Sequence, residues 1–312
     1  MTGPPSTIPL VILGGSDRRG TALPESGRDK QPLMGFKGAK LTVGGRPLIS
    51  VVIERMANSG LFDPIFIAGP ASVYRPLLPD ARIIDTDASF GENLRSAVDA
   101  VSRELDPDLL AFTTSDILPT EADLRRIVDD IRSHLPLDFW MLQCRVDRDL
   151  GASAWKPRYR LQPADEDHPV PVLPGHLVIG NPGVVRVEMV YRLFEMLYRT
   201  RNRSLRYRVF HLTRRLLWGF FLDDLRSLAS LRLPRMLWEV VINSLVAAVR
   251  LARGIRIPEI EDRMRRVYIR PEHRRRYPDR RGRVAVLDAL SFAKDIDTVE
   301  EAREVERHGF EG

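Results

Sequence analysis

A short apolar segment that ends at two glycines constrains the fold of this chain more than any other feature. The apolar run extends from Ile8 to Leu13 and stops at Gly14 and Gly15. A polar, basic loop rich in glycine and proline follows and extends to Lys40. Backbone N–H groups at glycines can approach a phosphate closely, so the segment predicts a buried strand followed by a ligand-binding loop. A surface turn with solvated charges explains the same residues, so the loop alone does not establish a ligand-binding site.

Strand and helix patterns then alternate along the chain. A helical run over 48–56 ends at an Asn-Ser-Gly stop, and an apolar strand follows over 64–70. Further strands are predicted over 81–85, 109–114, 138–145, 158–161 and 170–181, the last broken at Pro174-Gly175, and helices over 92–104 and after the N-cap Thr120. Strands joined through helices are typical of a parallel sheet, whose ligands bind at the carboxyl ends of the strands. The sequence therefore predicts an α/β fold.

The pattern changes after residue 184. Arginine-rich helical patterns run through 187–198, 207–232 and 236–252. We therefore divide the chain into a core over 1–184, a helical insertion or subdomain over 185–256, and a return to the core over 257–312. The return holds a dense arginine run, which predicts a solvated face, with nucleic-acid binding as an alternative. It ends in a strand over 284–287 and a final helix.

Composition limits the class of partner. The 312 residues are 44% hydrophobic and 29% charged, which is ordinary for a folded protein, and the net charge of +6 suits an anionic partner. The single cysteine, Cys144, excludes an intramolecular disulfide and fits a reducing cytosol. No signal-peptide pattern is present, and the uncharged run over 240–249 is shorter than the roughly 20 residues that span a bilayer. We expect a cytoplasmic protein and leave a peripheral membrane contact open.

Three separated motifs carry candidate chemistry. They are LGGSDRRG with KLTVGGRPLI, then TSDILPT, in which Asp116 follows an apolar strand, and finally DIDTVEEA before the last helix. In this order the chain resembles the MobA-like NTP transferases, the superfamily of molybdenum-cofactor guanylyltransferases. The resemblance covers most of residues 8–185 and the terminal helix. It implies a Rossmann-like, three-layer nucleotidyltransferase (GT-A-like) fold with a mixed, mostly parallel sheet.

The resemblance also implies an activity. A protein of this kind is a Mg²⁺-dependent nucleotidyltransferase that transfers NMP from an NTP to a phosphorylated small-molecule acceptor and releases pyrophosphate. The expected partners are the NTP and that acceptor, and nucleic acid is disfavoured. Self-association or membrane contact through the helical insertion stays open. Two other classes remain as alternatives, a catalytically inactive nucleotide-binding relative and a basic protein that binds membrane surfaces or nucleic acid.

Site residues follow from matching the motifs position by position. The resemblance assigns Asp116 and Asp297 as metal ligands, with Asp295 as the alternative, because a hard cation prefers carboxylate oxygens. Lys40 and Arg19 take catalytic roles. The nucleotide-binding positions are Leu13, Gly14, Gly15, Arg18, Lys37, Asn93 and Ser96.

Several of these assignments compete with simpler ones. The inserted segment over 21–36 lengthens the first loop, so Lys30, Lys37 and Lys40 are all candidates for the phosphate-contacting lysine. Lys40 is favoured because it directly precedes a strand and a Gly-Gly turn. The two metal-ligand aspartates could instead be turn or helix-capping residues. His176 and Asn181 resemble a strand that walls the acceptor pocket, although a lone histidine is more often structural.

Overall fold

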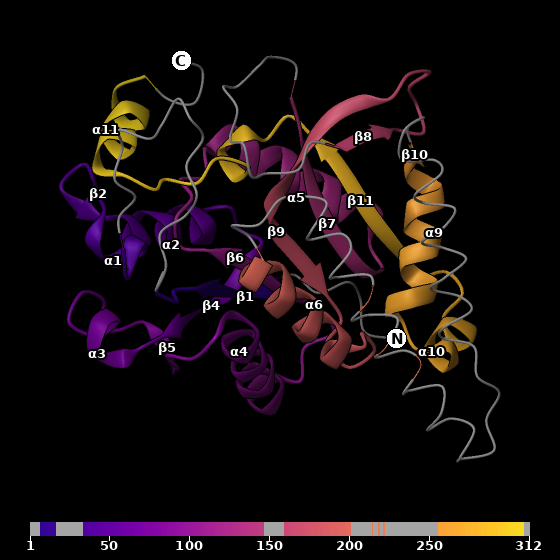
Figure 1. Cartoon of the computed structure of the whole chain (residues 1–312), viewed down its shortest axis with the longest axis horizontal. Coiled ribbons are helices and arrows are strands. Elements are labelled where there is room, and N and C mark those ends of the chain that lie inside the picture. Colours follow the sequence, from indigo (N-terminus) through magenta and orange to yellow (C-terminus); the bar gives the residue numbers. More distant parts are fainter. Residues whose placement is uncertain are drawn as a thin grey trace.

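A nine-stranded mixed sheet with helices on both faces forms the body of the protein (Figure 1). The computed structural model describes residues 7–16, 34–146, 159–200, 214, 218, 221 and 255–308. The strands of the sheet are β1 (Ile8–Leu13), β4 (Phe62–Gly69), β5 (Arg82–Asp85), β6 (Leu110–Thr114), β7 (Leu137–Arg145), β8 (Tyr159–Gln162), β9 (Val170–Gly180), β10 (Ile255–Arg256) and β11 (Arg281–Leu287). The helices are α1 (Lys37–Lys40), α2 (Leu48–Asn58), α3 (Ala71–Tyr74), α4 (Phe90–Leu105), α5 (Glu121–His134), α6 (Val187–Thr200), α9 (Ile257–Tyr268), α10 (Pro271–Arg276) and α11 (Val299–His308), with a 3₁₀ turn η2 (Leu290–Phe292).

Strand order places β1 at the centre of the parallel part of the sheet. Along one path the order is β10-β8-β9-β6-β1-β4-β5, and β9 also pairs with β7, which pairs with β11. Neighbours β6, β1, β4 and β5 run parallel, as do β7 and β11, whereas β9 runs antiparallel to β6, β7 and β8. The predicted α/β class with a mixed, mostly parallel sheet is confirmed.

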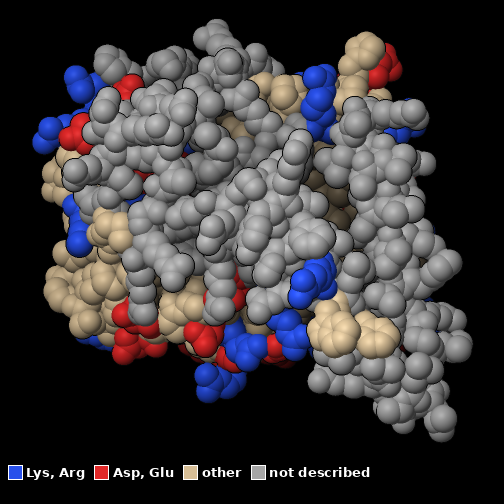
Figure 2. Space-filling model, in the orientation of Figure 1, with Lys and Arg blue, Asp and Glu red and all other residues tan. Residues whose placement is uncertain are grey.

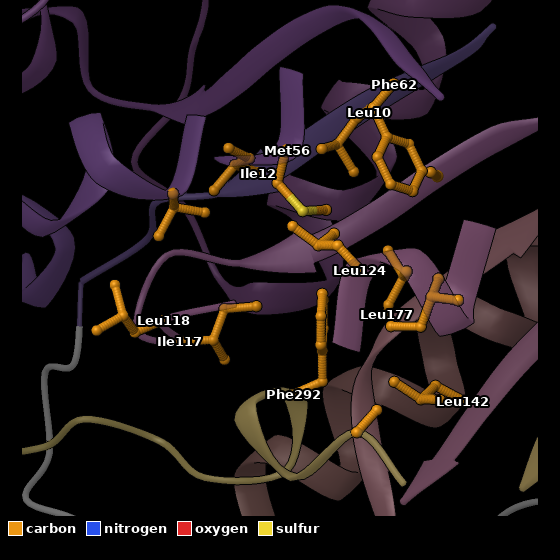
Figure 3. Close-up of a cluster of buried hydrophobic side chains, with 14 of the residues drawn as sticks. Leu10, Ile12, Met56, Phe62, Ile117, Leu118, Leu124, Leu142, Leu177 and Phe292 are labelled. Carbon is orange, nitrogen blue, oxygen red and sulfur yellow. The ribbon is translucent and has the colours of Figure 1, made fainter. Parts of the chain in front are cut away.

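Alternation along β1 supplies both faces of the sheet. Leu10 and Ile12 pack with α2, α5 and the η2 turn on one face, while Val11 packs with α4 and Tyr191 of α6 on the other. Figure 3 shows the first cluster, in which Met56 and Leu124 approach the sheet from their helices and Phe292 lies on the side of the C-terminal segment. These two apolar layers hold the ends of the parallel strands in place and therefore fix the loops that follow them.

The strand and glycine turn predicted after Lys40 are observed. Lys40 ends the short helix α1, and a separate hairpin of β2 (Thr42–Val43) and β3 (Arg46–Pro47) follows. Gly44 and Gly45 have φ of +58° and +72°, so this dipeptide reverses the chain tightly between two short strands. The strand predicted to break at Pro174-Gly175 is instead one strand, β9, and only its register with β7 shifts there.

The C-terminal segment returns to the sheet as a strand. β11 pairs in parallel with β7 and contains the predicted strand over 284–287, while the terminal helix α11 begins one residue after Thr298. The predicted helix over 187–198 is observed as α6. The helices predicted over 207–232 and 236–252 lie outside the described residues, except for positions 214, 218 and 221, which are helical. The three-part division of the chain stays a prediction.

Many charged side chains are paired across elements. The arginine run is not one solvated face, because Arg265 and Arg280 pair with Asp138 and Asp108, and Arg283 pairs with an aspartate of α5. On the face shown in Figure 2, described basic and acidic side chains alternate rather than forming one patch of a single sign. No helix within the described ranges is long and apolar enough to cross a membrane.

Candidate active site

Three motifs that are far apart in the sequence meet at one edge of the sheet. β1 and β6 are parallel neighbours, so the glycines after Leu13 and the aspartate after Thr114 lie at the same edge. The backbone N–H of Ile296 donates to the carbonyl of Asp116 at 2.7 Å, which joins the C-terminal motif to the tip of β6. The sequence-predicted convergence of these three motifs is therefore observed.

The glycine turn is held from behind by Tyr74. The phenol of Tyr74 is fully buried and donates to the carbonyl oxygen of Gly14 at 2.7 Å, while the N–H of Gly14 donates to Ala68 at 2.9 Å. Burial raises the pKa of Tyr74 well above its usual range, so the phenol stays a neutral donor. A Cβ on Gly14 would lie 2.6 Å from the phenol oxygen, so only glycine fits this position. The turn is therefore packed tightly on one side.

A buried ion pair stands in front of the strand ends. The ammonium of Lys37, at the start of α1, lies 2.5 Å from Oδ1 of Asp297, and both residues are under 10% exposed. Thr298 and Glu301 form a reciprocal cap that starts α11 and holds the backbone of Asp297, because Glu301 accepts its N–H at 2.8 Å. The aspartate side chain itself is not used as the helix cap. Helix capping therefore accounts for the position of the Asp297 backbone. It does not account for the Asp297 carboxylate, which binds Lys37 instead.

Asp297 is difficult to ionise in this environment. Burial is the main cause that raises its pKa to about 6, and the negative charges of Asp295 and Asp116 act in the same direction, while Lys37 opposes them. The raised pKa therefore reports mainly a desolvated carboxyl group, with two further carboxylates close by. Such clusters are common at functional sites.

This shift predicts how folding stability depends on pH. The folded carboxyl of Asp297 binds its proton more tightly than the unfolded one, so its contribution to the free energy of unfolding falls as pH rises from about 4 through 6. We expect the stability of the wild type relative to Asp297→Asn to decrease over this window. Urea unfolding of both proteins at several pH values measures that difference. A difference that stays constant or increases with pH contradicts the prediction.

Asp116 contributes a buried side-chain oxygen to the site. Its side-chain Oδ1 is inaccessible to solvent and accepts no hydrogen bond from the described residues. A buried carboxylate oxygen without a donor is costly, so the position calls for a cation or a donor that binds there. Together with Asp297 it offers two carboxylates, which matches the usual way that proteins hold Mg²⁺, with the remaining ligands from water and phosphate. The described residues contain no ready group of three or more metal-binding side chains.

Asp295 is paired with a histidine from β9. Nε2 of His176 lies 2.6 Å from Oδ1 of Asp295, and its Nδ1 lies 3.3 Å from the hydroxyl of Thr114 at the end of β6. The antiparallel register of β9 against β6 brings His176 to this edge of the sheet. Asp295 is thus oriented by a protein partner, which distinguishes it from Asp116.

Comparison with known structures places this arrangement in a known fold. A hypothetical transferase from Thermus thermophilus superimposes with a TM-score of 0.56 at 18% identity, over 95% of this chain and 99% of that one. The chain has the fold of this transferase. A CMP:2-keto-3-deoxy-manno-octonic acid synthetase complexed with CTP matches with a TM-score of 0.44 at 14% identity, over 63% of this chain and 85% of its own. HddC from Yersinia pseudotuberculosis complexed with GMP-PN matches with a TM-score of 0.41 at 13% identity, over 57% of this chain and 78% of its own. No family model and no curated protein sequence matches the chain.

Within this fold, Lys37 rather than Lys40 reaches the carboxylates. Lys40 is exposed, and its ammonium donates to the carbonyl of Met34 at 3.0 Å. The structure therefore brings Lys37, the second candidate from the sequence, to the carboxylate cluster. Lys40, the favoured candidate, lies outside it. Arg18, Arg19 and Lys30 lie outside the described residues, so their roles stay predictions.

The predicted nucleotide-binding positions on α4 lie near the glycine turn. Asn93 is 5% exposed, and its amide nitrogen would lie 3.1 Å from a Cβ placed on Gly15. Its Oδ1 accepts from Thr86 at 2.8 Å and from Ala88 at 2.9 Å, so the side chain also shapes the loop before α4. Ser96 is half-buried one turn further along. Contact of either residue with a nucleotide stays a prediction.

The structure separates the two residues that were predicted to wall an acceptor pocket. His176 lies at the active edge, whereas Asn181 lies at the opposite edge, where its amide donates to Asp108 at 2.8 Å. Since β9 runs antiparallel to β6, its end meets the start of β6. Asn181 therefore does not share the pocket with His176. Tyr74 is the supporting residue that sequence reasoning missed, and its only local signal is a tyrosine soon after the Gly69-Pro70 end of β4.

Close packing of α1 on the tip of β6 gives a second prediction. A Cβ on Gly38 would lie 2.7 Å from Cβ of Ser115 and 3.0 Å from its carbonyl oxygen. We expect Gly38→Ala to displace α1, to separate Lys37 from Asp297, and to destabilise the fold by about 2 kcal/mol. Denaturant unfolding measures the loss. Adding Ser115→Gly removes the nearest atom and should restore part of it, whereas equal stability of Gly38→Ala and wild type contradicts the prediction.

Proposed function

We propose that the protein is a Mg²⁺-dependent nucleotidyltransferase that transfers NMP from an NTP to a phosphorylated small molecule and releases pyrophosphate. The observation that carries this proposal is the buried oxygen of Asp116, which has no partner among the described residues and lies beside Asp297. It lies at the same strand ends as the turn at Gly14 and Gly15. A cation site next to a closely packed glycine turn suits a triphosphate, whose charge needs both metal and backbone donors.

Asp116 and Asp297 are the residues that would hold the cation. When bound, Mg²⁺ would supply charge neutralisation for the phosphates. Asp295, held by His176 at 2.6 Å, lies beside this pair and adds negative charge to the cluster. The raised pKa of Asp297 means that its proton must leave before a cation binds, so metal-dependent binding should weaken below about pH 6.

Lys37 is proposed as the phosphate-contacting lysine. Its ammonium is held at 2.5 Å from Asp297 and therefore lies at the carboxylate cluster. A lysine is a compact point charge with three donors, so it can keep one bond to the carboxylate while it binds a phosphate oxygen. This places positive charge where a departing pyrophosphate gains negative charge.

The reaction needs no base from the protein if the acceptor is already a phosphate. An acceptor phosphate oxygen attacks the α-phosphorus and forms a new P–O–P link. The bond from that phosphorus to its bridging oxygen breaks, and the electron pair leaves with pyrophosphate. The protein then contributes position and charge, which are the main requirements of phosphoryl and nucleotidyl transfer.

Binding and turnover should be tested on the full chain. Thermal unfolding with CTP, GTP, ATP and UTP, each with and without Mg²⁺, would identify the donor. A bound nucleotide at a hundred times its dissociation constant should raise the melting temperature by roughly 5 °C. Pyrophosphate release with a panel of sugar phosphates would then identify the acceptor. No shift with any nucleotide would remove the proposal, and a shift without turnover on any acceptor would favour the inactive relative.

A further inference from the structure

A pocket lies at the edge of the sheet opposite the candidate active site. It has a volume of about 540 Å³ and lies between the segment after β9 and the helix α10. Asp108 lines it and precedes β6, whereas Asp116 follows β6. A strand of 5 residues at about 3.3 Å per residue separates the two by roughly 16 Å. The pocket is therefore distinct from the proposed NTP site.

A buried ion-pair network supports one wall of this distal pocket, because His273 belongs to both. The carboxylate of Asp138 is fully buried and accepts from Nε of Arg265 at 2.8 Å and from Nε2 of His273 at 2.9 Å. The backbone N–H of Arg270 donates to the carbonyl of Val184 at 3.2 Å, which ties the two walls together. A network that satisfies its buried charge in this way holds its members in one geometry. The lining residue His273 is consequently held in one orientation.

The rim of the pocket carries more positive than negative charge. Arg270, Arg276 and Arg280 line it, against the carboxylates of Asp108 and Glu272. Arg280 is bound to Asp108 through both guanidinium NH groups. For Arg270 and Arg276, both exposed, no ion pair is found among the described residues, so two guanidinium groups remain available at the opening. Guanidinium groups bind phosphate oxygens in a bidentate fashion.

An aromatic pair lies beside these arginines. The rings of His273 and Tyr277 are 4.7 Å apart, Tyr277 is 40% exposed, and the guanidinium of Arg276 lies 5.4 Å from the Tyr277 ring centroid. An exposed tyrosine next to arginine gives a flat surface on which an organic group can stack. The volume also falls within the range of small-molecule sites.

We propose that this distal pocket binds a phosphate ester. The phosphate would lie between Arg270 and Arg276, and the organic part would lie against Tyr277 and His273. This ligand is separate from the donor and acceptor of the proposed reaction. A free phosphorylated metabolite and the phosphate headgroup of a lipid share this chemistry, and the experiment distinguishes them.

Isothermal titration of the full chain with phenyl phosphate, at constant ionic strength, tests the proposal. Arg270→Gln combined with Arg276→Gln should weaken binding at least about tenfold, because two charge-assisted contacts are lost. Arg275→Gln is the matched control, since this exposed arginine lies on the same helix and does not line the pocket. Asp116→Asn should leave the affinity unchanged, which separates this pocket from the proposed active site.

Two further arms identify the recognised part and its source. Tyr277→Ala should weaken phenyl phosphate but not inorganic phosphate, because only the ring contact is removed. Flotation with phosphatidylcholine vesicles, with and without phosphatidic acid, tests whether a lipid supplies the phosphate. The proposal is supported if the protein binds either the free ester or the phosphatidic-acid vesicles and the double variant loses that binding. Equal affinity of the wild type and the double variant overturns it. An equal loss of phenyl phosphate affinity in Arg275→Gln also overturns it, because diffuse electrostatic attraction, of the kind that binds nucleic acid, would not distinguish the arginines.

Discussion

Asp116→Asn should abolish most of the activity and at the same time make the folded protein more stable. The buried Oδ1 of Asp116 has no donor among the described residues, and Asp297 nearby adds a second negative charge. Removing one charge relieves this repulsion, and we expect a gain of about 1 kcal/mol in the free energy of unfolding. Removing a cation ligand should lower the rate of pyrophosphate release on the order of 10³-fold. Denaturant unfolding and a pyrophosphate assay measure the two effects.

Asp80→Asn is the control for this substitution. Asp80 is exposed in the turn before β5, away from the tips of β1 and β6, and the change removes the same charge. It should leave both activity and stability close to the wild type. If Asp116→Asn instead lowers stability and keeps activity, then Asp116 is a structural residue at the strand tip and the proposed metal role is wrong.

Lys37→Met should cause large losses of both stability and activity. The substitution leaves Asp297 buried without its cationic partner, and breaking one side of a buried ion pair costs about 3 kcal/mol. The loss should be smaller at pH 5 than at pH 8, because the unpaired carboxyl can take up a proton. Pyrophosphate release should fall on the order of 10²-fold, since the charge next to the phosphates is removed.

The neighbouring lysine supplies a matched comparison. Lys40→Met removes the same charge from the same helix, but Lys40 is exposed and bound only to a backbone carbonyl. We expect it to behave as the wild type. The double variant Lys37→Met with Asp297→Asn should recover stability without activity, because no unpaired charge is then buried. Equal activity losses in the two lysine variants would contradict the assignment of Lys37 as the phosphate contact.

The parts of the fold that local sequence determines were predictable. Apolar runs closed by glycine or proline mark β1 and β4, and Thr120 caps α5 as predicted, accepting from Asp123 at 3.2 Å. Asp116 could be placed at a strand tip because it closely follows the apolar run of β6. These features depend on residues that are close together along the chain.

The choice between the two lysines could not be predicted in the same way. Lys37 is buried because Asp297 meets it, and that aspartate is 260 residues away along the chain. A buried lysine is normally excluded unless a partner compensates its charge, and no local pattern announces the partner. The pairing of His176 with Asp295 depends on tertiary contact in the same way.

One error could have been avoided from the strand interpretation itself. Five residues along a strand extend roughly 16 Å, so His176 and Asn181 could never have lined one small pocket. The pairing of the C-terminal arginines could not have been predicted, because a run of like charge predicts solvent exposure. Only the folded arrangement shows that Arg265 and Arg280 neutralise buried or half-exposed aspartates.

The position of β11 has a consequence for the order in which the chain is made. Leu137–Arg145, which is almost entirely buried, lies between β9 and β11, and β11 follows it in sequence by more than a hundred residues. On the ribosome, β7 therefore emerges long before the strand that covers its free edge, and an uncovered apolar edge readily pairs with another chain. The same late segment carries Asp297 to the tip of β6. A nascent chain thus gains protection from aggregation and its second candidate metal ligand in a single closing step.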